Sequence, residues 1–456
     1  MIRTGMDKFL VVALAGLLAA CSGDVDKEKF DGDRISVLSF EATLLADPRL
    51  RNAPVPIIPP FRNSSWANPG GFATHAAYHL EVDGLEAAFD SQMVSGNSGL
   101  AVMKAPPVVG DGKIFAMGAS LDVAAMDADT GQALWSRSVL AEYSENNFGL
   151  SRFWGKRQRP ALVRDGFGGG LAYAAGRVFV TTGFGEVMAL NAETGEVIWR
   201  VQNNIGFSNA PTVRSGRVYV ASQDSRLQAF NAEDGTRLWE HLAIDEPATV
   251  MGATSVAVNE QVVVAGFSSG EVVALSPVNG QEAWSDSLTS RATQVTPLSQ
   301  LNAIVGRPVI DRDRVFVTSH GGRTVAFDVR SGERIWTADA GSIETPWPIG
   351  DYVLIMGLDG KLICLSREQG RVRWIADLPA YEGANNRGDR IRWAGPLLAS
   401  GKIVLASSDS RLATIDPTNG EVTALMDIDE PVSVTPVIAN GTLYLLGDGG
   451  TLMARR

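Results

Sequence analysis

The stretch that decides the fold is a ten-residue phrase that recurs along the chain, as in LNAETGEVIW (190–199) and FNAEDGTRLW (230–239). Further copies are MDADTGQALW (126–135), LSPVNGQEAW (275–284), FDVRSGERIW (327–336), LSREQGRVRW (365–374) and IDPTNGEVTA (415–424), the last with Ala424 in place of tryptophan. Successive marker positions lie 38 to 64 residues apart, the length of a four-stranded propeller blade with variable loops. The 456 residues are therefore read as repeats of one architecture and not as three domains.

Each position that recurs between the copies has a structural reason. Asp or Asn followed by glycine is hairpin chemistry, because the turn needs a side chain that caps its own backbone and a residue that accepts positive φ. The tryptophan begins the outermost strand, where a large ring can pack between neighbouring blades. A small residue recurs two positions before the first polar residue of the turn, which predicts a crowded layer between blades. It is found at Ala125, Ala189, Ala229, Ala274, Ala326, Thr414 and Ala454.

The number of repeats predicts how the ring closes. Seven copies are followed by an eighth repeat, residues 434–454, which ends after three strands. Closure removes sheet edges that would otherwise pair with other chains, so an N-terminal strand is expected to complete the eighth blade. Residues 87–94 fit better than the segment around Trp66, because Phe89 lies at the spacing from Pro106 that the complete repeats show. The predicted fold is all-β: an eight-bladed β-propeller of four-stranded antiparallel blades, closed by an N-terminal strand.

The N-terminus carries a targeting signal. Arg3 and Lys8 precede an apolar run that ends Leu-Ala-Ala-Cys at Cys21 and is too short to span a bilayer comfortably. This ending resembles the bacterial lipobox, which implies that Cys21 is acylated and is the first mature residue. Ser22 follows, and not the aspartate that retains enterobacterial lipoproteins at the inner membrane, so the outer membrane is expected. The predicted division is a signal peptide (1–20), a lipidated N-terminus with an extended charged and proline-rich tether (21–60), and the propeller (61–456).

Composition narrows the choice of partners. The formal charge of −11 and the pI near 5.0 argue against a nucleic-acid binder, which would need to neutralise phosphates. Proteins or small molecules are the expected partners. Besides Cys21 the chain has one cysteine, Cys364, which stands in the small-residue position of its repeat. It is read as a buried small hydrophobe without redox function.

The repeat resembles the pyrroloquinoline-quinone-type propeller repeat. With the lipobox, the tether and eight blades, the chain from Cys21 onward resembles the BamB family of outer-membrane assembly lipoproteins. The resemblance implies a non-catalytic scaffold of the β-barrel assembly machinery on the periplasmic face of the outer membrane. It further implies docking on a POTRA domain of the central barrel subunit, BamA, contact with other subunits of the assembly machinery, and assistance in the insertion of outer-membrane proteins. Unfolded outer-membrane proteins are further candidate partners.

The resemblance places two docking loops at residues 247–252 and 301–305, and the expected contact residues are Thr249, Val250, Met251, Leu301 and Asn302. Met251 stands where the enterobacterial pattern has arginine, and Ala303 and Val305 stand where it has aspartate. The polar contacts of that pattern therefore do not carry over. An apolar contact through Val250 and Met251 remains the expectation, and the alternative that both side chains pack against their own blades stays open.

The competing function is that of a periplasmic quinoprotein dehydrogenase, because these enzymes share the repeat. With Cys21 lipidated, Cys364 is the only mature thiol, so the adjacent-cysteine platform of many such enzymes is impossible. Asp127 and Asp129 occupy turn positions where capping explains them. No catalytic residue, cofactor or metal is therefore expected.

Two further features of the sequence stay open. His75 and His79 stand four residues apart but have no third metal ligand at a fixed spacing. The basic, aromatic insertion 151–164 allows either contact with lipid headgroups or an acidic partner, or a solvated loop.

Overall fold

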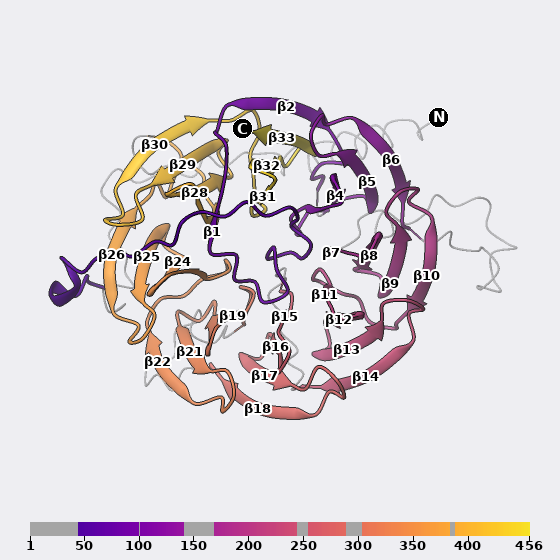
Figure 1. Ribbon diagram of the computed structural model, residues 1–456, viewed down its shortest axis with the longest axis horizontal. Coiled ribbons are helices and arrows are strands. Elements are labelled where there is room, and N and C mark those ends of the chain that lie inside the picture. The colour runs from indigo at the N-terminus through magenta and orange to yellow at the C-terminus, as the bar shows by residue number, and fades with distance from the viewer. Residues whose placement is uncertain (1–43, 100, 141–167, 244–253, 289–302, 384–387) are drawn as a thin grey trace, which may run out of the picture. The chain divides into compact units, whose positions relative to one another are not determined.

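Each repeat forms one blade of a ring of antiparallel sheets, and the strands of a blade follow one another from the axis outward (Figure 1). This computed structural model describes residues 44–99, 101–140, 168–243, 254–288, 303–383 and 388–456, which belong to one compact unit that begins at Leu44. Among these residues the only helical turn is the 3-10 helix η2 (Pro48–Leu50), and none of their helices is long and apolar enough to cross a membrane.

The blades are numbered here by their order in the chain. Blades 1 to 3 are β3 (Val108–Gly110), β4 (Lys113–Met117), β5 (Asp122–Asp127), β6 (Ala133–Ser138); β7 (Gly169–Ala174), β8 (Arg177–Thr182), β9 (Glu186–Asn191), β10 (Val197–Gln202); and β11 (Thr212–Arg214), β12 (Arg217–Ala221), β13 (Arg226–Asn231), β14 (Arg237–Leu242). Blades 4 and 5 are β15 (Ala257–Val258), β16 (Val263–Gly266), β17 (Glu271–Leu275), β18 (Glu282–Ser287); and β19 (Val309–Asp311), β20 (Arg314–Thr318), β21 (Thr324–Asp328), β22 (Arg334–Ala338). Blades 6 and 7 are β23 (Trp347–Ile349), β24 (Tyr352–Met356), β25 (Lys361–Ser366), β26 (Val372–Asp377); and β27 (Trp393–Ala399), β28 (Lys402–Ser407), β29 (Arg411–Ile415), β30 (Val422–Asp427).

Blade 8 joins the two ends of the ring. It consists of β31 (Val437–Ala439), β32 (Thr442–Leu446), β33 (Thr451–Arg455) and, as its outer strand, β2 (Ala87–Gln92). β2 pairs antiparallel with β33, and Phe89 lies opposite Ala454. The eight-bladed, all-β fold closed by an N-terminal strand is thereby confirmed, and the closing strand lies within the predicted segment 87–94.

In the six phrases that have it, the tryptophan packs its blade against the next one. On the third strand the small residue lies directly opposite the tryptophan, as Ala326 does to Trp336, so the ring has room to lie across the sheet. The Trp336 ring covers Gly370 in the turn of the following blade, where φ is +64° and an added Cβ would lie 2.5 Å from the ring. The indole N–H donates to the Arg367 carbonyl at 2.7 Å. The same bond to the next blade recurs for Trp135, Trp199, Trp239, Trp284 and Trp374, at 2.9 to 3.1 Å.

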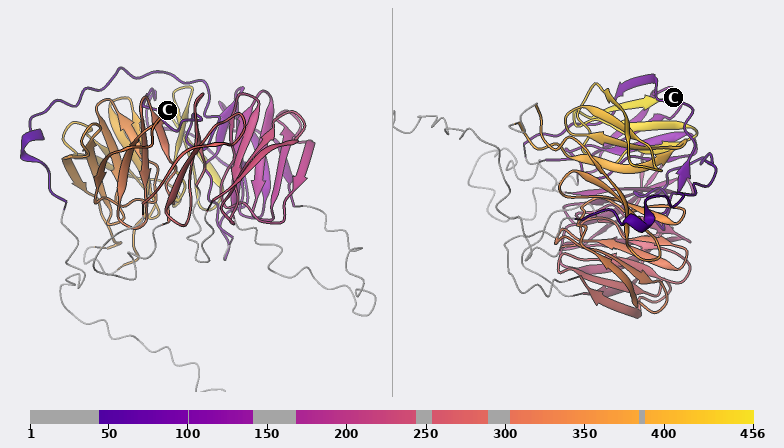
Figure 2. Two further views of the ribbon diagram at one scale, coloured as in Figure 1. Left: turned by 90° about the horizontal axis from the view of Figure 1, so that it is seen from below. Right: turned by 90° about the vertical axis from the view of Figure 1, so that its left-hand side faces the viewer.

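A second N-terminal element, residues 61–83, crosses one face of the ring and is called the strap. It makes one circuit that contacts the blades in their own order, beginning and ending at blade 8 (Figures 1 and 2). The contacts join Asn63 to Ile438, Trp66 to Val109, Ala67 to Tyr173, Asn68 to Val213, Ala73 to Val258, Thr74 to Ile310, Tyr78 to Trp347, His79 to Leu398 and Asp83 to Gly441. All but the last reach the innermost strands, and β1 (His79–Leu80) adds a parallel strand to blade 7.

Residues 44–60 differ from the extended tether that the sequence predicts. They lie along blade 6, where the Asp47 N–H donates to the Val372 carbonyl at 2.8 Å and Tyr352 donates its hydroxyl to the Pro54 carbonyl at 3.2 Å. Val55 is buried in the core. The proline-rich stretch is therefore held by carbonyl acceptors and apolar contacts, both of which proline keeps, although it lacks the N–H needed for a sheet.

Candidate interaction site

The residues predicted to contact partners lie outside the described part of the chain. These are the lipidation site Cys21 and the docking residues Thr249, Val250, Met251, Leu301 and Asn302. The basic insertion 151–164 lies outside it as well. The structure describes, however, the residues that flank the two predicted docking stretches, and these define where the stretches join the ring.

The two stretches belong to connections between adjacent blades, and described residues at the ends of these connections are bonded to each other. One runs from β14 to β15 and the other from β18 to β19. The Thr254 hydroxyl, just after the first stretch, donates to the Val305 carbonyl at the end of the second, at 2.8 Å. Ala303, Ile304 and Val305 are buried, and the Ile304 N–H donates to the Phe267 carbonyl at 3.1 Å. The fold therefore holds Thr254, two residues after the first stretch, beside residues 303–305 at the end of the second.

The described residues at the ends of these connections lie at the face of the ring opposite the strap. The turns after the first and third strands of blade 1 meet at one face, where the Ala128 N–H donates to the Gly112 carbonyl at 2.9 Å. The strap lies at that face, because the Asn440 N–H in the corresponding turn of blade 8 donates to the Asn63 carbonyl at 2.8 Å (Figure 2, left). A connection from an outer strand to the next inner strand begins at the other end of the blade, so the strap leaves that face uncovered.

Buried polar groups gather where the strap meets blades 5 and 6. His75 is fully buried and its Nδ1 lies 2.8 Å from the Pro308 carbonyl, so Nδ1 carries a proton and donates to that oxygen. Burial lowers the pKa of His75 to about 3, and the neighbouring Arg307 guanidinium adds to this effect. Burial also lowers the pKa of Arg307 to about 10 and raises that of Glu344 to about 7. Trp66 of the strap stacks on Trp347 of blade 6, with ring centroids 6.5 Å apart.

The two histidines that stand four apart do not form a metal site together. His79 accepts the Gly401 N–H at Nε2, at 2.7 Å, and its Nδ1 donates to the Ile58 carbonyl at 2.6 Å. Both ring nitrogens of His79 are thereby occupied by backbone groups. In the described ranges no group of three or more His, Cys, Asp or Glu side chains has metal-binding geometry.

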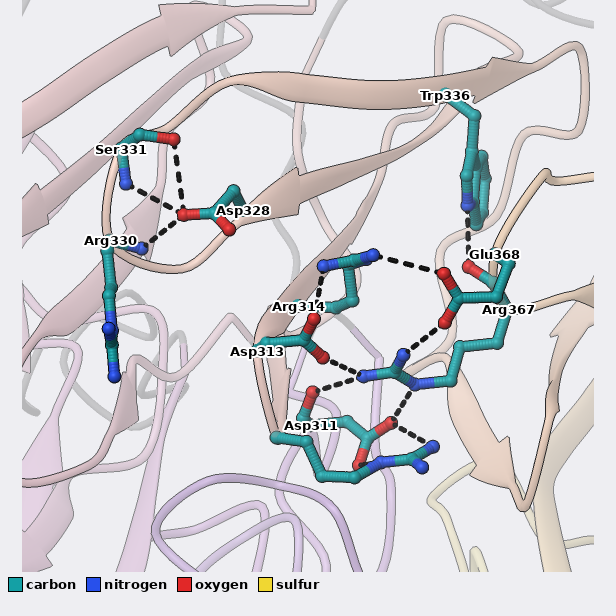
Figure 3. Close-up of polar contacts among 10 residues, drawn as sticks. Asp311, Asp313, Arg314, Asp328, Arg330, Ser331, Trp336, Arg367 and Glu368 are labelled. Atoms are coloured by element: carbon teal, nitrogen blue, oxygen red, sulfur yellow. Dashed lines mark hydrogen bonds and ion pairs between the residues drawn. The ribbon is translucent and has the colours of Figure 1, made fainter.

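A cluster of charged side chains joins blades 5 and 6 (Figure 3). Arg367, only 4% exposed at its side chain, contacts the fully buried Asp311 at 2.8 Å and Asp313 at 2.5 Å, and pairs with Glu368 at 2.7 Å. The bonds to these carboxylates raise the pKa of Arg367 despite its burial, and the bond from Arg367 lowers the pKa of Asp313. Tyr78 of the strap donates to Asp311 at 2.9 Å. Because each charge has a partner in the fold, this cluster is a structural contact that connects two blades and the strap.

The acidic turn positions serve the backbone. Asp328 accepts the N–H groups of Arg330 and Ser331, both at 2.9 Å, as Figure 3 shows. Asp127 accepts the N–H groups of Asp129 and Thr130 in the same way. Cys364 is buried opposite Trp374, and burial raises its pKa, so its thiolate is disfavoured. The capping role of these carboxylates and the buried position of Cys364 agree with the sequence analysis.

The strap is the feature that sequence reasoning missed. The signal was weak, because the segment has no repeat phrase and pairs mainly through backbone groups. Trp66, considered as a second candidate for the closing strand, instead exchanges backbone hydrogen bonds with Val109 of blade 1, at 2.8 and 2.9 Å. It is 1% exposed, and a tryptophan in a segment without periodicity was the one indication that this segment belongs to the core.

Comparison with known proteins separates fold from family. A structure of BamB from Moraxella catarrhalis has a TM-score of 0.64 at 15% identity, over 81% of this chain and 99% of that one. A quinohemoprotein alcohol dehydrogenase from Pseudomonas putida HK5 has a TM-score of 0.62 at 14% identity, over 86% of this chain and 80% of that one. At such identities both comparisons show the propeller fold alone.

Sequence comparison is more specific. The family model for outer membrane protein assembly factor BamB matches residues 150–376. The BamB proteins of Salmonella typhimurium and Escherichia coli (strain K12) are each 30% identical to this chain over 76% of its length, which covers 83% and 82% of those proteins. This chain belongs to the BamB family of outer membrane protein assembly factors.

Proposed function

We propose that this chain is a non-catalytic scaffold of the outer-membrane β-barrel assembly machinery, held on the periplasmic face by acylation of Cys21. In this role it docks on a POTRA domain of the central barrel subunit and assists the insertion of outer-membrane proteins. The proposal is supported by membership of the BamB family, whose curated members carry the name outer membrane protein assembly factor. The lipobox-like ending at Cys21 supports the anchor.

The observation that carries the docking proposal is the hydrogen bond from Thr254 to the Val305 carbonyl at 2.8 Å. It brings together two connections that are about 50 residues apart in the chain, so a partner can contact both at once. The buried ends of these connections prevent rearrangement at the ring, which lowers the entropic cost of binding. Val250 and Met251 would supply the apolar centre of such a contact.

A scaffold without catalysis is supported by the way the described polar groups are used. In the strap, Trp66 stacks on Trp347 and the His75 ring is bound to the Pro308 carbonyl. Burial shifts the pKa values of His75 and Arg307, and Arg367 is paired with Asp311 of the neighbouring blade. Packing of the fold therefore accounts for these polar groups.

The test of docking is titration of the double variant Val250→Asp/Met251→Asp against the POTRA region of the same organism. Burying two unpaired charges should weaken binding by several kcal/mol, on the order of 3–5 kcal/mol. Val278→Asp is the matched control, because Val278 belongs to blade 4, is 67% exposed and lies in the turn at the strap face. Circular dichroism checks that both proteins are folded.

Equal binding of the double variant and wild type would remove Val250 and Met251 from the interface, and Leu301 with Asn302 would be tested next. Failure of the wild-type protein to bind any POTRA region would overturn the scaffold proposal itself. Quinone-dependent dye reduction by the purified protein would instead favour the dehydrogenase alternative.

The anchor has its own test. A Cys21→Ser variant should lose the acyl mass detected by mass spectrometry on the wild-type protein, and it should leave the outer-membrane fraction when partners are removed. A variant that stays in that fraction without partners would show that the lipid is not the anchor.

A further inference from the structure

The chain enters the propeller at the outer edge of blade 6. The helix η2 lies there beside β26, at the outside of the ring (Figure 1). Leu44 packs against the apolar cluster of blades 5 and 6, and the Asp47 N–H is bonded to the Val372 carbonyl of β26. The point at which the N-terminal segment joins the body is therefore fixed by packing and by the backbone.

This edge carries a cluster of positive charge, the basic edge, which consists of Arg49, Arg51, Arg371 and Arg373. Asp47 is shared by two of its members, with Arg49 at 2.7 Å and Arg371 at 3.5 Å. Arg373 donates to the Ala53 carbonyl at 3.2 Å, which holds the segment against the blade. The Arg49 and Arg371 side chains are 69% and 40% exposed, so the cluster keeps an exposed positive charge in a chain whose net charge is −11.

An exposed leucine accompanies these charges. Leu45 is 76% exposed, more than any other large apolar side chain of the described ranges. Its neighbour Leu44 packs into the core, so Leu45 is left at the surface beside η2. Arginines next to an exposed apolar side chain are the combination that binds the interface of an anionic bilayer, where each cationic residue contributes about 1 kcal/mol.

The length of chain before this edge fits the same partner. Residues 22–43 connect Cys21 to Leu44 and reach at most about 80 Å when fully extended. A lipid on Cys21 would therefore keep the basic edge within that distance of the membrane and raise its effective concentration there.

We propose that the basic edge binds anionic phospholipid headgroups, so that the ring meets the bilayer through blade 6. The orienting effect rests on the lipid anchor of the proposed function, whereas the headgroup contact does not. An edge-on approach leaves both faces of the ring accessible, including the face where Thr254 and Val305 join the two connections.

The test uses the chain from residue 21 onward with Cys21→Ser, which cannot be acylated. It is floated with vesicles of phosphatidylcholine alone and with vesicles that contain about one third phosphatidylglycerol. Binding should require phosphatidylglycerol and weaken as salt rises from about 0.05 to about 0.5 M, because salt screens the contact. The triple variant Arg49→Gln/Arg51→Gln/Arg371→Gln should partition at least about tenfold more weakly.

The matched control is Arg137→Gln/Arg237→Gln/Lys402→Gln, which removes the same charge from blades 1, 3 and 7 and should bind like wild type. Because the triple variant also removes both partners of Asp47, a second variant is needed. Arg51→Glu alone, at an exposed position, leaves those partners in place and should also weaken binding.

Equal flotation of wild type, triple variant and Arg51→Glu would overturn the proposal, and so would an equal loss in the control. Vesicle binding without POTRA binding would overturn the scaffold and keep the basic edge, and the reverse outcome would do the opposite.

Discussion

The blades and the strap hold the same ring by different means. A blade is made of neighbours in sequence, and its contact with the next blade uses one tryptophan ring, one turn glycine and one indole hydrogen bond, as at Trp336 and Gly370. The strap is a single non-repeated segment whose bonds to the inner strands run mostly between backbone groups. The blades therefore depend on side-chain identity, whereas the strap depends on the path of the chain.

The N-terminal segment closes the ring in two places. Strand β2 completes blade 8 at the outside, and the strap joins the inner strands across one face. Both elements come from the N-terminal residues 61–92, so one short segment supplies contacts that span the whole ring. The propeller should thus be less modular than its repeats suggest.

Truncation from the N-terminus, which can remove both closing elements, should have the largest effect on thermal stability. Removing residues 22–43 should leave thermal stability unchanged, since the compact unit begins at Leu44. Removing residues 22–94 takes away the strap and β2 together, and should open the ring and cause aggregation. Removal of 22–60 should be intermediate, because it exposes the blade 6 surface under Val55. Equal melting temperatures for all three truncations, measured by calorimetry, would refute the double closure.

Within the blades, the tryptophan contact should be the largest single contribution. Trp336→Ala should lower the free energy of unfolding by about 3–5 kcal/mol, because it removes a buried ring and its bond to the Arg367 carbonyl. Ile335→Ala is the control on the same strand, since Ile335 is 37% exposed, and should cost less than about 1.5 kcal/mol. Urea denaturation measures both, and similar losses would mean that the lock is not specific.

Within the strap, His75 should make the protein sensitive to acid. Its folded pKa of about 3 lies below the ordinary 6.5, so on acidification the unfolded chain takes up a proton that the folded chain cannot. The stability that neutral His75 allows is complete above pH 6.5 and is lost as the pH falls toward 3. His75→Gln should remove roughly 3 kcal/mol of this loss between pH 7 and pH 4. Urea unfolding at both pH values tests this, and parallel losses in variant and wild type would exclude His75 as the cause.

The smallest expected effect concerns a side-chain bond of the strap. Tyr78→Phe removes the hydroxyl that donates to Asp311 at 2.9 Å but leaves Arg367 in place as the partner of that carboxylate. The free energy of unfolding should fall by about 1 kcal/mol. A loss as large as that of Trp336→Ala would show that the strap, too, is held mainly by side chains.

Sequence alone was enough for the blades, because their determinants are local. The tryptophan four residues after the glycine and the opposing small residue recur in every full copy but the seventh, where Ala424 lies opposite Thr414. The turn begins at Asp or Asn in all copies except two, which have Ser276 and Ser366 there. The incomplete eighth repeat required a closing strand, and the spacing of Phe89 placed it. The Phe89 ring lies over Gly131 as the tryptophans lie over their glycines, so the position of the strand also followed from the repeat.

Only the tertiary structure decided the course of residues 44–83 and the contact between Thr254 and Val305 at the ends of the two predicted docking connections. Backbone hydrogen bonds such as those between Trp66 and Val109 leave no pattern in the sequence, since nearly any residue supplies the same N–H and C=O groups. His75 has φ +63° in the strap, a conformation that no period predicts. The bond from Thr254 to Val305 joins residues whose proximity depends on how two blades pack, and packing of distant segments is not encoded by local spacing.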